Sequence, residues 1–309
     1  MSDTSFNQDL IKSLLDDRKR DRLWRNIRFI VYVLFMAAFL SFLIPSPTIT
    51  TKQPYVALVR MTGIIMPGQT FSARTVIPNL IDAFKDKQAR GVVLLINSPG
   101  GSPVQASIIH DKIIQLKHQY HKEVIVVAED MLASGAYLVA TAADKIYVNP
   151  DTITGSIGVI MEGFGFTDAI KKLGVSRRVF TAGTNKDRLD SFLPLNPTDV
   201  AKVQDLLNEA HENFIEDVID GRSGKLKGQR DELFSGDFWT GKTAAKLGLV
   251  DGTADLWTVL QQQFNVEHYK DYSVEPGLIA MLIRGTESAL HLPDLGEVTS
   301  APGLRAELG

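Results

Sequence analysis

The segment Gly91-Val-Val-Leu-Leu-Ile-Asn-Ser-Pro-Gly-Gly101 predicts a buried strand that ends in a glycine turn. Its continuous apolar run, residues 92–96, is typical of a parallel strand covered on both faces by helices. The two glycines allow positive φ angles and a close approach of the backbone to a ligand. A second apolar run, residues 124–128, follows about one strand-helix unit later. The sequence therefore predicts an α/β fold with a parallel sheet.

The second apolar run leads into Met131-Leu-Ala-Ser-Gly-Ala-Tyr137. A strand that ends here and continues as a helix would present Ser134 beside the unpaired N–H groups of the first helical turn. Such N–H groups can stabilise an oxyanion, so the segment predicts a nucleophilic serine. Taken separately, each of the two glycine-containing motifs is also common in ordinary turns and loops.

In this order, the two motifs resemble those of the crotonase-like serine peptidases, including ClpP and, more closely, the signal peptide peptidase A (protease IV) family in its short single-domain form. The resemblance covers roughly residues 54–251 and implies a ClpP/crotonase-like fold of repeated β-β-α units. It implies that the N–H groups of Gly101 and Gly135 form the oxyanion hole. It also implies a homo-oligomer in which the catalytic serine and its base can come from adjacent subunits.

The identity of the base separates the two relatives, because ClpP uses a Ser-His-Asp triad and the signal peptide peptidases use a Ser-Lys dyad. No histidine lies between Ser134 and His211, the interval in which the ClpP pattern places its base. His211 stays open as an alternative base. The sequence predicts that His110, His118 and His121 lie on the solvated surface.

The segment Thr181-Ala-Gly-Thr-Asn-Lys-Asp-Arg188 matches the Gly-x-x-Lys turn of the family and places Lys186 52 residues after the serine. The resemblance implies that Lys186 is the general base; the alternative is a surface lysine in a polar loop. A lysine accepts a proton only where desolvation or a nearby cation disfavours its charge, so we expect Lys186 to be buried. Ser156 is expected to orient the lysine amine, with Thr154 as the second candidate and a purely structural turn as the alternative.

The N-terminal region predicts a membrane anchor. Residues 29–44 are uncharged and apolar, and with Ile27 and the flanking residues they reach the lower length limit for a bilayer-spanning helix. Seven Lys and Arg residues, of which Arg28 is the last, precede this uncharged run. We expect a cytoplasmic basic tail over 1–26, a transmembrane signal anchor over 27–44 and a linker over 45–54. A cleaved signal peptide is the alternative, but no small-x-small cleavage site follows the apolar run. The catalytic domain would then lie outside the cytoplasm, attached to the inner membrane.

The remaining chain is expected to form a catalytic domain over 55–263 and a C-terminal tail over 264–309. Periodicity predicts a long amphipathic helix over 198–219 with a continuous apolar face. Strands are predicted over 145–148 and 157–161, and residues 178–180 also have a strand-like pattern.

Composition excludes several classes of function. The chain has no cysteine, so disulfides and cysteine-ligated metals are excluded, and no histidine-carboxylate motif for a metal is present. The net charge of −3 and the lack of a basic patch with interleaved aromatics argue against a nucleic-acid partner. We expect no cofactor.

These patterns predict a membrane-anchored serine endopeptidase with a Ser-Lys dyad. The resemblance implies that its substrates are cleaved signal peptides and other unfolded, apolar peptides. Two alternatives stay open. A crotonase-type acyl-CoA enzyme would use the same oxyanion geometry without a nucleophile or an anchor, and a catalytically inactive membrane-associated scaffold would keep the fold alone.

Overall fold

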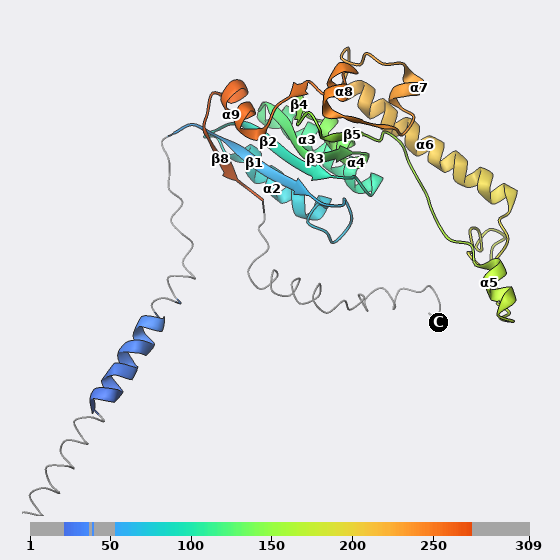
Figure 1. The fold of residues 1–309 in the computed structure, drawn as a ribbon, viewed down its shortest axis with the longest axis horizontal. Coiled ribbons are helices and arrows are strands. Elements are labelled where there is room, and N and C mark those ends of the chain that lie inside the picture. Colours follow the sequence, from blue (N-terminus) through green and yellow to red (C-terminus); the bar gives the residue numbers. More distant parts are fainter. Residues whose placement is uncertain (1–21, 37–38, 40–52, 274–309) are drawn as a thin grey trace, which may run out of the picture. The chain divides into compact units, whose positions relative to one another are not determined.

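The computed structural model describes residues 22–36, 39 and 53–273 (Figure 1). The chain divides into two units, Met1–Lys52 and Gln53–Gly309. Residues 22–36 are helical and exposed. Among the described residues, no helix combines the length and the apolar character that a bilayer crossing requires. Much of the predicted anchor and linker, and most of the predicted tail, lie outside the described residues.

One sheet of eight strands organises residues 53–273. The strand order is β6-β5-β3-β2-β1-β8, and β4 pairs with both β3 and β7. Every pairing is parallel except that of β5 with β6. The strands are β1 Tyr55–Thr62, β2 Ala89–Ser98, β3 Val124–Ala133, β4 Lys145–Val148, β5 Ile153–Gly155, β6 Phe238–Thr240, β7 Gly252–Thr253 and β8 His268–Asp271. The predicted α/β class with a largely parallel sheet is confirmed.

Helices cover both faces of the sheet (Figure 1). Helices α2, α3 and α4 share one core with the sheet, and α9 packs on the opposite face. The helices are α2 Ala73–Lys85, α3 Pro103–Tyr120, α4 Gly135–Thr141, α5 Thr167–Lys172, α6 Pro197–Gly221, α7 Arg230–Leu233, α8 Gly241–Lys246 and α9 Leu256–Phe264. The start of α3 is fixed by Ser102, whose hydroxyl accepts the Gln105 N–H, and by Pro103 in the first turn.

Strand β2 shows why its apolar run is uninterrupted. Leu94 and Ile96 belong to the core under α2 and α3, whereas Val93 and Leu95 belong to the core under α9. Successive side chains alternate between the two cores, so every position of the strand must be apolar. Full burial of each such side chain contributes about 1.5–3 kcal/mol. The glycine turn that follows β2 is therefore held on a rigid strand.

Strand β3 changes partners along its length. Residues 125–128 pair with β4, whereas residues 131–133 pair with β5. The register with β2 also shifts between Ile96 and Ser98, beside this change. The last three residues of β3 therefore belong to a different strand pair from its beginning, and they lead directly into α4.

We refer to residues 160–200 as the arm. Helix α5 has no buried residue, and the arm exposes large apolar side chains, among them Ile160, Phe164 and Phe180. The strand predicted over 157–161 and the strand-like segment over 178–180 do not form, because neither has a neighbouring strand with which to pair. Apolar sequence alone cannot form a strand without a hydrogen-bonding partner.

Helix α6 confirms the helix predicted over 198–219, but its apolar face is only partly used. Phe214, Ile215 and Val218 are buried, near the end that contacts α4. The opposite end adjoins the arm, and there Val200 and Leu206 stay exposed. Figure 1 shows α6 leading from α4 toward α5.

The C-terminal boundary of the sheet lies beyond the predicted one. Helix α9 ends at Phe264, and β8 then pairs in parallel with residues 55–58 of β1. The segment predicted to be a tail after residue 263 thus supplies an edge strand. Its pattern did not reveal this role because the strand is only four residues long and mostly polar.

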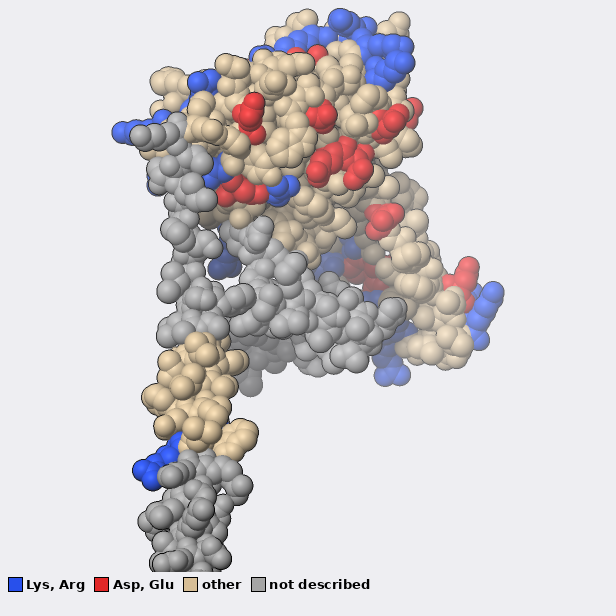
Figure 2. Space-filling model, turned by 60° about the vertical axis from the view of Figure 1, so that its left-hand side comes forward, with Lys and Arg blue, Asp and Glu red and all other residues tan. Residues whose placement is uncertain are grey.

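The face drawn in Figure 2 carries acidic side chains separated by uncharged surface, while its Lys and Arg side chains lie mainly toward the rim. Neither sign of charge covers this face continuously. It therefore offers no extended surface of a single charge to a highly charged partner.

Candidate active site

Ser134 occupies the turn between β3 and α4. Its φ is 53° and its ψ is −127°, and its side chain makes no capping hydrogen bond to the helix that follows. A non-glycine residue in such a region costs about 1–3 kcal/mol and persists only where its surroundings impose it. Here the Ser134 N–H donates to the Gly155 carbonyl oxygen at 2.8 Å, and its carbonyl accepts from the Leu138 N–H at 3.1 Å. These bonds hold the backbone in place while the hydroxyl stays uncommitted to the helix.

The glycine turn after β2 lies against this serine. A Cβ added at Gly100 would lie 2.7 Å from the Ser134 Cβ and 2.8 Å from the Gly135 nitrogen. At Gly101, whose φ is 145°, a Cβ would lie 2.3 Å from the Ile65 carbonyl oxygen. Both positions therefore require glycine, and the turn brings its backbone into contact with the start of α4.

Two backbone N–H groups meet beside Ser134. Two hydrogen bonds form the bridge between Ile65 and Gly101. The Ile65 N–H donates to the Gly100 carbonyl oxygen, and the Ser102 N–H donates to the Ile65 carbonyl oxygen. This pattern leaves the Gly101 N–H out of the ladder. Gly135 is the first residue of α4, so its N–H has no acceptor within the helix. The Cβ position of Gly135 lies only 3.6 Å from the Gly101 nitrogen. The turn therefore places two donors together, as an oxyanion requires.

A cavity of about 440 Å³ opens beside these groups. Ser134, Gly101 and Gly135 form part of its lining, and its walls are largely apolar. The apolar walls come from α3, α4 and α6 and include Val104, Ile108, Leu138 and Phe214. A nucleophile on the wall of an apolar cavity is suited to attack a substrate whose side chain occupies the cavity.

Thr154 and Ser156 lie on either side of Gly155, the residue that accepts the hydrogen bond from Ser134. The Thr154 hydroxyl is fully buried and has no hydrogen-bond partner among the described residues. Ser156 has a φ of 51° and is half-buried, and its N–H donates to Asp237 at 2.7 Å. The strained turn thus carries two hydroxyls, and that of Thr154 is the one that is fully buried without a partner among the described residues.

Lys186 lies elsewhere, in an exposed turn of the arm. Its backbone N–H donates to the Gly183 carbonyl oxygen, and it is not among the residues that line the cavity of Ser134. The expectation that Lys186 is buried is therefore not met within a single chain. The arm has its own internal contacts, such as the ion pair of Arg177 with Asp190, but little of this chain covers it.

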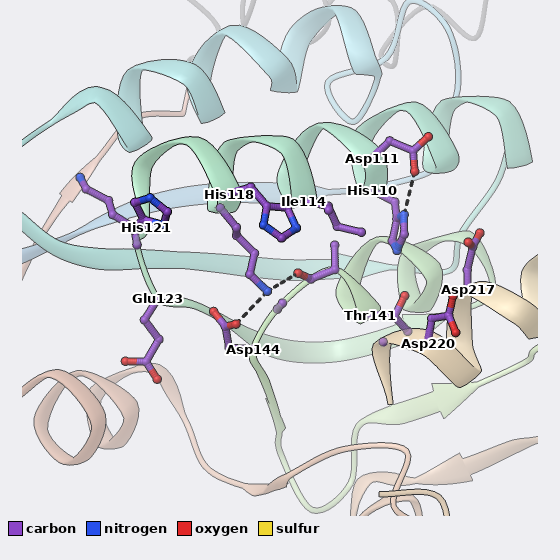
Figure 3. A pocket seen from close by; sticks show the side chains of 15 residues that line it. His110, Asp111, Ile114, His118, His121, Glu123, Thr141, Asp144, Asp217 and Asp220 are labelled. Carbon is purple, nitrogen blue, oxygen red and sulfur yellow. Dashed lines mark hydrogen bonds and ion pairs between the residues drawn. The ribbon is translucent and has the colours of Figure 1, made fainter. Parts of the chain in front are cut away.

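Of the three histidines that were expected on the surface, one is buried instead. His118 and His121 are exposed as predicted, but His110 is only 5% exposed because it lies on the inner face of α3. Figure 3 shows His110 pointing toward α6, from which Asp217 and Asp220 project. The alternative base His211 contacts the Ile157 carbonyl oxygen through Nε2 at 3.0 Å and does not line the cavity of Ser134.

Helix α6 supplies a wall of the cavity that the sequence reasoning missed. Asn213, Phe214 and Asp217 line it, although they lie about 80 residues after the serine. Asp217 follows Phe214 by three residues and Asn213 by four, which places them on one helical face and was the available signal. The sequence could not show which face turns toward Ser134.

A buried ion pair anchors the end of α6. The side chain of Arg222 is 1% exposed, and its guanidinium donates to Asp251 at 2.6 Å and to the Gly248 carbonyl oxygen. Burial alone would raise the pKa of Asp251, but hydrogen bonds from Arg222, Lys225 and the Ile146 N–H outweigh it and lower that pKa. Breaking such a pair from one side leaves an uncompensated buried charge, so the contact fixes α6 against the sheet.

No group of three or more His, Asp and Glu side chains among the described residues is arranged to hold a metal ion. The chemistry that the arrangement offers is that of Ser134, the two N–H groups and the polar side chains around them.

The sheet and the strained serine turn are those of the ClpP-like class of α/β proteins, and the Clp protease family profile matches residues 49–153. A second profile, that of peptidase family S49, matches residues 117–267. The chain belongs to peptidase family S49, the family of signal peptide peptidase A.

Individual relatives support this membership. A Synechocystis protein named as a protease is 31% identical, over 66% of this chain and 72% of its own length. Protease 4 of Haemophilus influenzae is 31% identical, over 75% of this chain and 40% of its own length. A Brucella melitensis protein named as the Na⁺/H⁺ antiporter NhaA is 45% identical, over 68% of this chain. The match spans only 29% of that Brucella protein.

Proposed function

We propose that this protein is a membrane-anchored serine endopeptidase in which Ser134 is the nucleophile and Lys186 is the general base. The observation that carries the proposal is the strained Ser134 turn, whose hydroxyl borders an apolar cavity beside the N–H groups of Gly101 and Gly135. Membership of a peptidase family supports the same conclusion.

In this mechanism the Ser134 Oγ attacks the carbonyl carbon of the scissile peptide, and its proton passes to the Lys186 Nζ. The carbonyl oxygen becomes an oxyanion and accepts hydrogen bonds from the two glycine N–H groups. Collapse of the tetrahedral intermediate breaks the C–N bond, and the lysine returns the proton to the leaving amine. Water then attacks the acyl-enzyme ester, loses a proton to the lysine and releases Ser134.

The position of Lys186 determines the form of this proposal. In one chain the lysine lies on an exposed arm whose apolar residues have little cover. We therefore propose that the arm of one copy brings Lys186 to the Ser134 of a neighbouring copy in a homo-oligomer. Burial in that interface would supply the desolvation that a lysine base requires. The buried Thr154 hydroxyl, or that of Ser156, would accept a hydrogen bond from the lysine amine or donate one to it.

The proposed substrates are cleaved signal peptides and other unfolded, apolar peptides, and the proposed location is the outer side of the cytoplasmic membrane. The apolar cavity beside Ser134 suits side chains of this kind. An extended peptide can add main-chain hydrogen bonds beside the glycine turn while one of its side chains fills the cavity.

The test is labelling of the detergent-solubilised protein with a fluorophosphonate, followed by hydrolysis of a synthetic signal peptide. We expect an adduct on Ser134 in the wild type and none in Ser134→Ala. Lys186→Ala should lose both labelling and hydrolysis while it remains oligomeric. Lys171→Ala, which removes another exposed lysine of the arm, is the matched control and should keep both.

A catalytically inactive scaffold of the same fold is the second candidate, favoured by the separation of Lys186 from Ser134 within one chain. A folded oligomer that is neither labelled nor active in its wild-type form would support the scaffold and reject the peptidase.

A further inference from the structure

The cavity beside Ser134 contains one charged side chain among the described residues that line it, the carboxylate of Asp217. Asp217 lies on α6, one helical turn after Phe214, and is half-buried. A carboxylate within largely apolar walls costs desolvation energy unless a cation or a set of donors compensates it. Its presence there calls for a partner.

No described side chain supplies a hydrogen bond or an ion pair to Asp217. Its nearest candidate is His110, which belongs to a second cavity of about 920 Å³ that Asp217 also lines (Figure 3). The Nδ1 of His110, however, lies 3.1 Å from Asp111 Oδ1. The imidazole is therefore engaged with a carboxylate of its own helix, and Asp217 has no direct hydrogen-bond or ion-pair partner among the described residues.

The charges around Asp217 are of both signs. Partial burial raises the pKa of its carboxyl, His110 opposes this rise, and the neighbouring carboxylates Asp111, Asp220 and Glu216 add to it, so that the pKa is raised as a whole. The ionised form thus gains from any cation that enters the cavity.

The shape of the cavity indicates what that cation would be attached to. The cavity is lined by the apolar side chains of Val104, Ile108, Leu138 and Phe214. Ser134 and Asp217 line the same cavity. Lysine and arginine side chains bury an apolar stem and keep a charged end paired, which matches this combination. A free cation would leave the apolar walls uncovered.

We propose that Asp217 is a specificity-determining residue, which selects a lysine or arginine side chain on the acyl side of the scissile bond. The acyl-side residue is the relevant one because its carbonyl would be held by Gly101 and Gly135, which border the same cavity. This inference rests on the proposed peptidase function, and it adds a basic preference to an otherwise apolar site.

The experiment uses the full-length protein in detergent and three synthetic peptides that differ only in the acyl-side residue: lysine, its uncharged analogue norleucine, and glutamate. In the wild type we expect kcat/KM for the lysine peptide to exceed that for norleucine about tenfold, which equals about 1.4 kcal/mol. Asp217→Asn should bring this ratio close to one.

Glu216→Gln is the matched control, because it removes the same charge from the adjacent, exposed position of α6, which does not line the cavity. It should keep the tenfold ratio. Asp217→Asn should also raise kcat/KM for the glutamate peptide, a gain that a misfolded variant cannot produce.

The inference is overturned if the wild type does not prefer lysine, if Asp217→Asn keeps the preference, or if Glu216→Gln loses it equally. Hydrolysis of the norleucine peptide with no effect of Asp217 rejects the specificity inference and leaves the peptidase intact. Failure to cleave any peptide, together with an unlabelled Ser134, rejects both.

Discussion

The turn around Ser134 and the arm that carries Lys186 differ in how this chain packs them. Ala136 and Tyr137, directly after the serine, are completely buried, whereas Phe180 on the arm is 93% exposed. The turn is fixed by neighbours from β2, α3 and β5, all within the same chain. The arm carries large apolar residues, among them Ile160, Phe164 and Phe180, without that cover. Apolar side chains exposed together mark a surface that binds another molecule. In the proposed mechanism, the surroundings of the nucleophile are therefore complete in one copy, whereas those of the proposed base are not.

The largest expected effect tests whether the two regions work together across copies. Ser134→Ala and Lys186→Ala should each lower peptide hydrolysis by about 10⁴-fold or more. When the two variants are co-expressed, a mixed oligomer that pairs a normal serine with a normal lysine from the neighbour should recover activity at about a quarter of its sites. Measurement of kcat in the purified mixture checks this outcome. Pairing within one chain would give no recovery.

The next effect concerns the glycine turn. Gly101→Ala would place a methyl group 2.3 Å from the Ile65 carbonyl oxygen and displace the N–H that faces Ser134. Loss of one oxyanion donor lowers kcat by about 10²- to 10³-fold. Gly68→Ala is the control, because Gly68 also has positive φ, at 82°, but nothing lies within 4 Å of its Cβ position. Equal losses in the two variants would show that backbone strain, not the donor, is responsible.

A third pair of variants compares stability in the two regions. Leu132→Ala creates a cavity in the core and should lower the free energy of unfolding by about 2–5 kcal/mol. Phe180→Ala removes an exposed side chain and should change it by no more than about 0.5 kcal/mol in the dissociated chain. It should nevertheless weaken self-association, which sedimentation can measure alongside urea unfolding. A large loss of monomer stability in Phe180→Ala would mean that the arm packs on its own domain.

The smallest expected effect concerns the stability of the fold at acid pH, to which Asp86 contributes. Burial alone would raise the pKa of Asp86, but hydrogen bonds from Tyr272, the Gln88 N–H and Tyr55, together with Lys270, lower it to about 2. A carboxylate with a lowered pKa stabilises the fold above its unfolded pKa of about 3.9, and that contribution disappears as the pH falls toward 2.

Asp86→Asn should therefore reduce Tm at neutral pH and make Tm less dependent on pH between about 4 and 2. Thermal unfolding of both proteins across this range measures the difference. The exposed neighbour Asp82→Asn is the control and should keep the wild-type slope. If Asp86→Asn keeps that slope as well, the acid sensitivity arises elsewhere.

The sequence predicted best those structural features that depend on neighbouring residues alone, or that require the same kind of side chain at every position of a helix or strand. The runs 92–96 and 124–128 are apolar throughout because both faces of the sheet are covered. The Ser134 turn could be predicted for a similar reason, since the glycine that follows the serine marks a strand-to-helix junction. The helix over 198–219 was predicted because its 3.6-residue period is independent of what it contacts.

The errors arise where the outcome depends on distant partners. The strand over 157–161 has the right composition but no strand beside it. His110 is buried because it lies on the inner face of α3, and Asp217 reaches the cavity of Ser134 because α6 packs against α4. Lys186 is exposed in the single chain, and the burial expected for it would require the neighbouring copy proposed above. Residue patterns identify side chains, and only tertiary packing identifies their neighbours.

Strand β8 has a consequence for handling this protein. It occupies the outer edge of β1, and Arg60 and Asp271 join the two strands through a 2.6 Å contact. A chain truncated after residue 263 would leave the hydrogen-bonding groups of β1, a strand of largely buried apolar residues, open along that edge. An open edge of this kind is a template for intermolecular strand addition. Such a truncated domain should therefore precipitate during purification, whereas one that extends through residue 273 should stay in solution.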